Sequence, residues 1–344
     1  MKRLYLLTFC SMALTTCIFF LKERNPTTIA AGKGLVLPKE WLVANNITIT
    51  PKKDRRPADQ TLLTYPEWFL VFSPQEQATY YTQHTSTTFP FNSHTAQIWQ
   101  SYKIVDDQIK GNFPKNTGYH FMIWVIGTSA SVEYSIKAWY ETIIGRITDT
   151  NTPVTAEDQF NARFTQDYVD FIKDRPWYEF DFKSRLKTLW TSTPFMGSHF
   201  LRKVERRYIL TSELLVKHIY SKLIGLGTKQ IYEEALPTTA VILDNDSLHY
   251  LPRYDKFAVA ATDLAKQGHS FKEIAGNNTA ILLTILVPTR CYTTFENAQT
   301  VFTQPIAADY TMKRIALAVP VPSLNKLLLQ LDKEKITIEH VFDF

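Results

Sequence analysis

The chain has 344 residues, 45% of them apolar, and a net charge of +5 from 38 basic and 33 acidic side chains. This composition excludes a globally disordered protein, and no basic run is long enough to predict a nucleic-acid-binding arm. Only 11 glycines are present, which argues against glycine-rich phosphate-binding loops. Cys10 and Cys17 lie in the N-terminal apolar stretch and leave Cys291 alone. A disulfide framework and a thiolate zinc site are therefore excluded within one chain.

The N-terminus predicts a membrane anchor. A basic start at residues 1–3 precedes 18 uncharged residues, 4–21, close to the roughly 20 that span a bilayer as a helix. An uncleaved signal-anchor in contact with the lipid bilayer is favoured over a lipoprotein signal at Cys10 or Cys17 and over cleavage near Ala30. The positive-inside rule then places the bulk of this single-pass protein outside the cytoplasm.

Residues 22–60 have the composition of a linker between the anchor and the folded body. Prolines are frequent in this segment, and residues 52–56 form the charged run Lys-Lys-Asp-Arg-Arg. Such a run can contact anionic headgroups, but a solvated linker is the favoured interpretation.

The body begins with an internal repeat. Residues 64–101 match residues 155–192 at a constant shift of 91, and residues 133–148 match residues 213–228 at a shift of 80. The matched pairs include Phe89/Phe180, Phe91/Phe182, Trp99/Trp190, His120/His199, Glu133/Glu213, Lys137/Lys217, Tyr140/Tyr220 and Gly145/Gly225. Because the motifs follow the same order in both copies, we expect a duplication.

Each copy is predicted to form three helices. The copies span 64–148 and 155–228 within an α-helical domain over 61–235, and they are expected to pack about a pseudo-twofold axis. Thr64 and Thr155 are predicted N-caps of the first helices, and Ser93 and Ser184 of the second helices. The third and longest helices are expected over 121–147 and 201–224.

The third helices carry the strongest candidates for chemistry. Glu, Lys and Tyr recur at i, i+4 and i+7, which places them on one face of each helix. The six residues are Glu133, Lys137, Tyr140, Glu213, Lys217 and Tyr220. A buried, paired Glu–Lys that fixes how the copies dock is the favoured interpretation, because buried charges need partners. The alternative is a catalytic acid/base site at the pseudo-twofold axis.

Two further groups of residues are weaker candidates. His120 and His199 are matched and could bind a metal, but caps of the third helices are favoured because the usual close ligand spacings are missing. The helix expected over 201–224 carries four basic residues in its first turns, where they oppose the helix dipole: Arg202, Lys203, Arg206 and Arg207. They hint at a protein partner or acidic headgroups, although a solvated cluster is favoured.

Residues 245–344 show a different pattern. Strands are expected at 247–250, 269–274, 279–287, 314–319 and 336–342, with helices at 255–267 and 324–335. Ile315, Leu317 and Val319 alternate onto one face. This order predicts a ferredoxin-like sandwich with one sheet and two helices. The fold class is therefore α+β, with a membrane helix, a duplicated all-α domain and a C-terminal α+β domain.

Four motifs carry a family resemblance: Thr64–Trp68, Gly127–Tyr134, Trp177–Phe180 and Glu205–Arg207. With them the chain resembles a family of bacterial membrane-anchored proteins of unassigned function, over residues 61–344. The resemblance implies no catalytic residues. No cofactor is expected.

Three functions follow as hypotheses. The first is a membrane-anchored, extracytoplasmic binding or assembly protein. The second is an enzyme that uses the paired Glu-Lys-Tyr faces, and the third is a small-ligand sensor that acts through the C-terminal domain. An enzymatic role is not favoured, because no nucleophile, metal-ligand or nucleotide motif has its required context.

Overall fold

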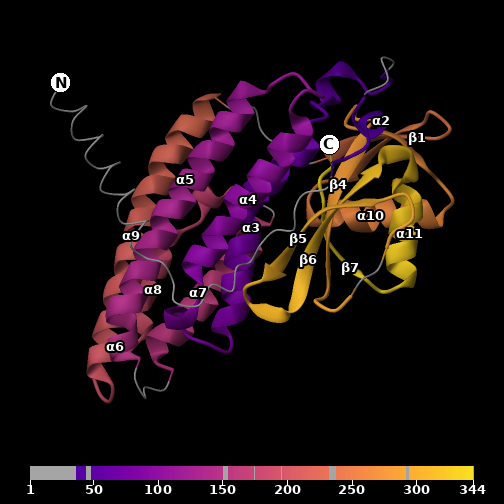
Figure 1. Cartoon of the computed structure of the whole chain (residues 1–344). Coiled ribbons are helices and arrows are strands. Elements are labelled where there is room, and N and C mark those ends of the chain that lie inside the picture. Colours follow the sequence, from indigo (N-terminus) through magenta and orange to yellow (C-terminus); the bar gives the residue numbers. More distant parts are fainter. Residues whose placement is uncertain are drawn as a thin grey trace.

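The computed structural model describes residues 36–43, 48–149, 154–173, 175–194, 196–231, 238–291 and 294–343. Long helices occupy one half of the protein and antiparallel sheets the other (Figure 1), so the predicted α+β class is confirmed. The expected anchor at 4–21 lies outside the described residues. Within those ranges, no helix combines the length and the apolar character needed to cross a membrane.

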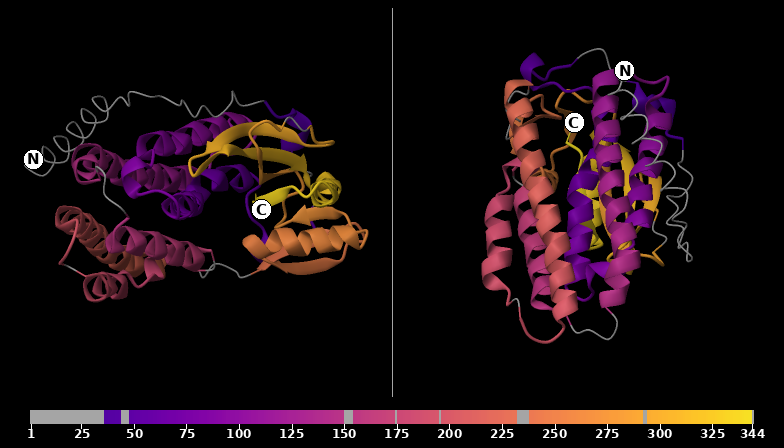
Figure 2. Two further views of the ribbon diagram at one scale, coloured as in Figure 1. Left: turned by 90° about the horizontal axis from the view of Figure 1, so that it is seen from below. Right: turned by 90° about the vertical axis from the view of Figure 1, so that its left-hand side faces the viewer.

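The helical half contains two sets of three helices. The first set is α3 (Gln60–Tyr81), α4 (Phe91–Ile109) and α5 (Thr117–Tyr140), and the second is α7 (Ala156–Ile172), α8 (Phe182–Ser192) and α9 (Phe200–Ile231). Between the sets lie the π-helical turn η3 (Glu141–Gly145) and the short α6 (Arg146–Thr148). Helix α3 packs along α7, while α5 and α9 lie at the side farthest from the sheets (Figures 1 and 2).

The predicted helix caps were right at only one of four positions. Thr155 caps α7 and accepts a hydrogen bond from the Asp158 N–H, while the Asp158 carboxylate accepts from the Thr155 N–H. Thr64, in contrast, lies inside α3, which starts at Gln60 and buries Leu63. The earlier start brings one more turn of apolar residues into the core.

The second helices also begin earlier than expected. Both start at the phenylalanine two residues before the serine, so Ser93 and Ser184 lie in the first turn. In α8 the Asp181 side chain accepts a hydrogen bond from the Ser184 N–H at 3.0 Å. An aspartate one position before the helix is a strong cap, and it makes the serine cap unnecessary.

The other half contains two antiparallel sheets. One sheet has the order β2-β1-β3 and the other β5-β6-β4-β7. The strands are β1 (Thr238–Leu243), β2 (Leu248–Pro252), β3 (Phe271–Ile274), β4 (Ala280–Pro288), β5 (Gln299–Ile306), β6 (Asp309–Pro320) and β7 (Thr337–Val341), and the helices are α10 (Asp255–Lys266) and α11 (Leu324–Lys333). The expected single ferredoxin-like sheet is therefore wrong. The sequence interpretation missed β5, which contains Pro305, and β1, which begins in the segment expected to join the domains.

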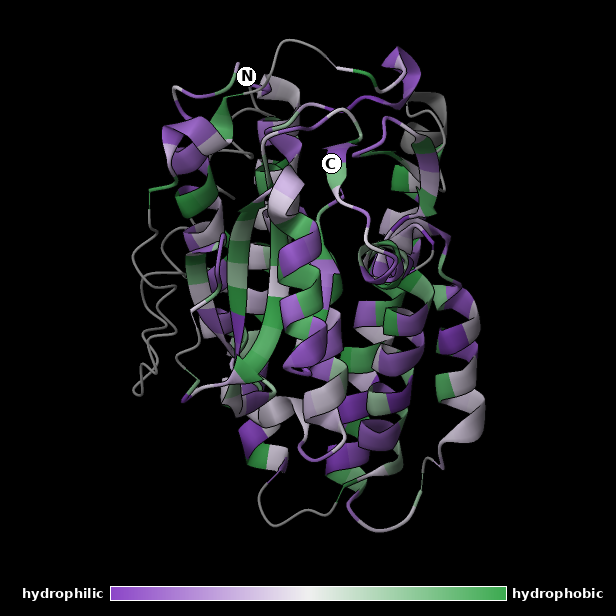
Figure 3. Cartoon of the chain, turned by 90° about the vertical axis from the view of Figure 1, so that its right-hand side faces the viewer, coloured by the Kyte–Doolittle hydropathy of each residue, from purple (hydrophilic) through white to green (hydrophobic). Residues whose placement is uncertain are grey.

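Both faces of the four-stranded sheet are buried. Along β4, Leu283 joins the same apolar core as Leu328 of α11, whereas its neighbour Leu282 joins a second core with Leu63 of α3. This alternation is the side-chain period of a strand. The predicted one-sided row on β6 is confirmed, because all three members belong to the α11 side: Ile315, Leu317 and Val319. The helical and sheet halves thus share one core and fold against each other (Figure 3).

Part of the expected linker belongs to the folded body. The N–H groups of Ile49 and Thr50 donate to the Glu273 carboxylate at 2.7 and 2.8 Å, and the Arg56 N–H donates to the Ala275 carbonyl. Residues 48–56 are therefore tied to the β3 segment rather than solvated along their whole length. The linker prediction is wrong here because the partners lie more than 200 residues away in sequence.

Candidate functional site

Four charged residues join α5 to α9. Lys137 Nζ lies 2.8 Å from Glu213 Oε1 and 3.0 Å from Glu133 Oε1. Lys217 Nζ lies 2.9 Å from Glu213 Oε1 and 3.3 Å from Glu133 Oε1. Each lysine thus binds the glutamate one turn away and the glutamate of the other helix. The structure brings together these four predicted residues as one cluster, which we call the α5–α9 ion cluster.

The charges in this cluster stabilise one another. Burial alone would raise the pKa of Glu213, but Lys137 and Lys217 outweigh it and lower that pKa to about 2. Burial opposes the charged form of both lysines, yet the two carboxylates raise both lysine pKa values above the ordinary range. Glu133 is the most accessible member, with 39% of its side chain exposed, against 13% for Glu213. All four groups are therefore charged near neutral pH.

The matched tyrosines do not join the cluster. The Tyr140 hydroxyl donates to the backbone carbonyl of Glu205, and the Tyr220 ring stacks on Trp177 with centroids 5.5 Å apart. Two other tyrosine rings lie next to the ammonium groups. Lys137 Nζ is 5.8 Å from the centre of the Tyr134 ring, and Lys217 Nζ is 5.5 Å from the centre of the Tyr168 ring. The expected Glu-Lys-Tyr constellation is therefore a Glu-Lys constellation.

Several contacts recur at matched positions of the two helix sets. Trp99 Nε1 donates to Ser131 Oγ at 2.8 Å, and Trp190 Nε1 donates to Thr211 Oγ1 at 3.1 Å. The shifts are 91 for the tryptophans and 80 for the acceptors, as in the sequence repeat. Ring contacts recur as well, with edge-on pairs at Phe89/Phe91 and Phe180/Phe182, and at Tyr80/Phe89 and Phe171/Phe180.

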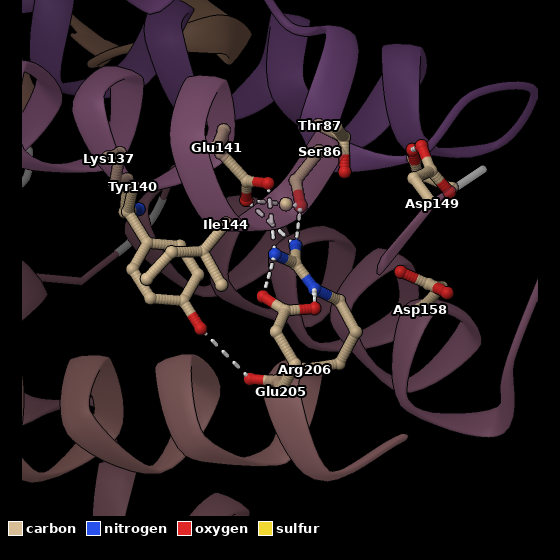
Figure 4. A network of polar contacts seen from close by, with 12 residues as sticks. Ser86, Thr87, Lys137, Tyr140, Glu141, Ile144, Asp149, Asp158, Glu205 and Arg206 are labelled. Carbon is tan, nitrogen blue, oxygen red and sulfur yellow. Dashed lines mark hydrogen bonds and ion pairs between the residues drawn. The ribbon is translucent and has the colours of Figure 1, made fainter. Parts of the chain in front are cut away.

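A second charge cluster lies inside the helical half and surrounds Arg206 (Figure 4). Its Nη1 and Nη2 donate to Glu141 at 2.7 and 2.9 Å, and its Nε donates to Glu205 at 2.7 Å. A further Nη2 bond reaches Glu205, and Nη1 also donates to Ser86 Oγ at 2.6 Å. All five N–H groups of this guanidinium are therefore used.

The other two arginines of the same helix turn are also buried. Arg202 Nη2 donates to Asp158 at 3.0 Å, and Arg207 Nη2 donates to Glu157 at 2.7 Å. The expectation of a solvated or partner-binding basic cluster is therefore wrong for Arg202, Arg206 and Arg207, whose acidic partners lie within the chain. Lys203, the fourth member, is half-buried and donates to the Met196 carbonyl.

The π-helical turn η3 shapes this second cluster. It follows α5 directly and begins with Glu141, whose carboxylate accepts from Arg206 and from the Ser86 hydroxyl. A Cβ at Gly145 would overlap the Glu141 carboxylate, so the turn accommodates this carboxylate only with glycine at that position. Single π-turns are often found at functional positions of helices.

The two candidate histidines have separate surroundings. His120 is buried, and its Nδ1 lies 2.9 Å from the Tyr102 hydroxyl; Asn116, not His120, caps α5. The His199 carbonyl accepts from the Lys203 N–H at the start of α9. His199 also lines a shallow pocket of about 320 Å³ with Ile147, Thr148, Phe200, Leu201 and Arg202. The described residues include no group of three His, Cys, Asp or Glu side chains that could hold one metal ion.

A third polar cluster, which the sequence interpretation missed, lies where the two halves meet. Arg314 of β6 binds Glu339 through two bonds of 2.6 and 2.7 Å and binds Glu76 of α3 at 3.0 Å. Glu76 also accepts from the Ala307 N–H at 2.7 Å. The sequence signal was limited to two charged residues inside otherwise apolar strands, Arg314 and Glu339.

The motif at residues 64–68 lies at the same junction. The Tyr119 hydroxyl donates to the Glu67 carboxylate, and burial raises the pKa of Glu67. The Trp68 ring packs against His340 of β7 with centroids 3.6 Å apart and ring planes tilted by 31°. Tyr65 also contacts Phe302 of β5, so Tyr65 and Trp68 hold the helical half against the sheets, whereas Thr64 and Glu67 bind Tyr119 within the helical half.

Comparison of the chain with protein-family models, with curated proteins and with solved structures finds no match.

Proposed function

We propose that this protein is a membrane-anchored, extracytoplasmic binding or assembly protein whose duplicated helical half is a rigid scaffold. The α5–α9 ion cluster carries the proposal. Its four charges connect the two helix sets and satisfy one another, as expected of groups that fix how two packed units dock.

The protonation behaviour of the cluster favours this role over acid/base catalysis. A general acid or base works best with a pKa near the operating pH. Glu213 has a pKa of about 2, and the pKa values of Lys137 and Lys217 are raised above their usual range. A proton transfer at any of these three groups near pH 7 would break the pairs that hold α5 to α9.

The recurrent contacts support a gene-level duplication of residues 64–148 and 155–228. A chance similarity of composition does not require that Trp99 and Trp190 find hydroxyl acceptors at matched positions, Ser131 and Thr211. Two copies related in this way need few new interactions to dock, because each lysine finds an equivalent glutamate on the other copy.

The location is tested with reporter fusions to the C-terminus. We expect alkaline phosphatase, which folds outside the cytoplasm, to be active in the fusion, and a cytoplasm-dependent fluorescent reporter to be dark. A control variant with Lys2→Glu and Arg3→Glu removes the basic start and should weaken this orientation. Activity of the cytoplasmic reporter alone would overturn the proposed location.

The assembly role is tested on the full chain extracted from membranes with mild detergent. We expect native electrophoresis or mass photometry to show a complex larger than the 39.7 kDa chain with its detergent. A particle that contains only a single chain, at every protein concentration and detergent tested, would contradict the role in assembly.

A further inference from the structure

The side of the helical half farthest from the sheets exposes two rows of large apolar side chains. On α5 and η3 the row is Phe121, Trp124, Ile136, Trp139 and Ile143, each 44–65% exposed. On α9 the row is Leu201, Tyr208, Leu215, Ile219, Leu223 and Leu226, each 46–76% exposed. We call this surface the α5–α9 face; Figures 1 and 2 show both helices along that side.

Each row follows one side of its helix. At 100° per residue the members of each row fall within about 120°, and they extend over about 33 Å on α5 and about 38 Å on α9. By the same spacing, Glu133 and Lys137 lie roughly 120–160° around α5 from Phe121, so the row points away from the α5–α9 ion cluster. A surface of this length is larger than the scattered apolar residues that monomeric proteins usually expose.

Both copies of the repeat carry the row. Ile136, Trp139 and Ile143 correspond to the exposed Val216, Ile219 and Leu223 at the shift of 80, and Phe121, next to His120, corresponds to Phe200, which is 43% exposed. Packing among the described residues does not explain apolar side chains at these positions, since they are exposed in that part of the chain. A partner outside the body does explain them.

The exposed charges within α8 and α9 are positive, while Glu179 and Asp181, just before α8, add two exposed carboxylates. The carboxylates of α5, η3 and α9 all point into internal ion pairs with lysines or Arg206. The charged side chains of α8 and α9 that the structure describes as exposed are Lys183, Lys187 and Lys222. A second copy seated on this face would bring the positive edges together, whereas an anionic lipid surface would neutralise them.

We propose that the α5–α9 face lies on an anionic lipid bilayer, with α5 and α9 in the membrane plane and their apolar rows among the headgroups and upper acyl chains. Helices that lie in the interface have this combination of an apolar row, aromatic residues and a basic edge. The proposal rests on the anchored location proposed above, which keeps the body near a bilayer.

The chain before the described residues is long enough for this arrangement. Leu37 is packed at the end of α4, where its N–H donates to the Gln108 side chain, and α5 begins eight residues after α4 ends. The 14 residues 22–35 between the expected anchor and the body can extend over roughly 46–50 Å. The anchor can therefore enter the same bilayer on which the face lies.

The test uses the full chain in nanodiscs, with either a neutral or a phosphatidylglycerol-containing bilayer. Nitroxide labels are placed at Ile136→Cys and Val216→Cys on the face and at Val259→Cys, an exposed control on α10, after replacement of the native cysteines. We expect the two face labels to collide at least twofold more with oxygen than with a water-soluble nickel complex in the anionic bilayer. The control label should show the opposite preference.

A second variant tests the charge contribution. In the variant with Lys187→Glu and Lys222→Glu, the face labels should collide less with oxygen and more with the nickel complex, as the control label does. In the parent, 1 M salt should have the same effect, because it shortens the screening length to about 3 Å. Face labels as open to water as the control in the anionic bilayer would overturn the proposal. If neither oxygen nor the nickel complex reaches the face labels and the labels show strong spin–spin coupling, a second copy of the chain covers the face. That result would also overturn the proposal.

These outcomes are separate from failure of the anchor. If the chain does not co-purify with nanodiscs, the proposed anchor is wrong. The face is then tested with the same labels and with added phosphatidylglycerol vesicles. Oxygen-accessible face labels in that experiment would support the lipid-binding face without an anchor, and water-exposed labels would contradict it.

Discussion

Lys137 of α5 lies 2.8 Å from Glu213 of α9, so the lysine of one repeat unit is bound by the glutamate of the other. The reciprocal pair, Lys217 and Glu133, is 3.3 Å long. Pairs within one helix can form in an isolated helix, but the two crossed pairs need both units in place. They therefore report on docking of the units rather than on helix formation.

The first prediction concerns this crossed pair. Lys137→Met should lower the free energy of unfolding by about 3–5 kcal/mol, because it leaves two partly buried carboxylates with one lysine. The double variant Lys137→Met with Glu213→Met keeps Glu133 paired with Lys217, so it should cost much less. Chemical denaturation of the parent, both single variants and the double variant gives the coupling energy.

The control for this cycle is the exposed pair Lys103 and Asp107, one turn apart on α4. Its coupling energy should be about 0.5 kcal/mol or less, as for other surface pairs. A Lys137→Met variant as stable as the parent would contradict a structural role of the α5–α9 ion cluster.

The second prediction uses two glycines of α5. A Cβ at Gly127 would lie 2.9 Å from the Trp99 ring, so Gly127→Ala should destabilise the protein by about 1–3 kcal/mol. A Cβ at Gly118 would meet no atom within 4 Å, so Gly118→Ala should be neutral or stabilising by up to about 1 kcal/mol. Thermal denaturation of both variants checks the difference in sign. Equal effects would show that Trp99 does not pack on Gly127 in solution.

The ion pairs within α5 and within α9 were predictable from sequence, because they depend only on residue spacing along one helix. The i, i+4 spacing of Glu133 and Lys137 indicated an ion pair, and the repeat indicated its counterpart in α9. The spacing could not reveal the crossed pairs, because they depend on how two distant helices dock. It also misplaced Tyr140, whose hydroxyl turns to the Glu205 carbonyl where α5 passes into the π-helical turn.

The buried arginines show where local reasoning fails. Three arginines in two turns of a helix look like a solvated cluster, because basic residues oppose the dipole at a helix start. Their partners come from other parts of the chain, and Glu141 precedes Arg206 by 65 residues. The two-sheet arrangement was missed for a similar reason, since strand order depends on long-range pairing that periodicity does not encode.

The third prediction tests the geometry around Arg206. Lysine carries the same charge but offers three donors from one nitrogen, so it cannot reproduce two bidentate contacts with Glu141 and Glu205. We expect Arg206→Lys to lower the free energy of unfolding by about 2–4 kcal/mol, close to the effect of Arg206→Met. Arg163→Lys, on the exposed surface of α7, is the matched control and should have no measurable effect. Full stability of Arg206→Lys would mean that charge alone, not the planar fork of donors, is needed there.

The last prediction concerns acid stability and His340. This side chain is 2% exposed, packs against the Trp68 ring, and has a pKa lowered to about 3 by burial and by the nearby Arg253. In the unfolded chain its pKa is near 6.5, so the unfolded state binds a proton below that pH while the folded state does not. The stability that depends on neutral His340 is therefore complete above pH 6.5 and is lost progressively as the pH falls toward 3.

Between pH 7.5 and pH 5 this residue should lower the free energy of unfolding by about 2 kcal/mol. His340→Phe keeps an aromatic ring against Trp68 and cannot be protonated, so its loss over the same range should be smaller by about that amount. His94, whose pKa is also lowered by burial, remains in both proteins and its contribution cancels in the comparison. Urea denaturation of the parent and His340→Phe at the two pH values measures the difference. Parallel pH profiles would show that His340 titrates at its ordinary pKa in the folded protein, and that the junction between α3 and β7 is open to water.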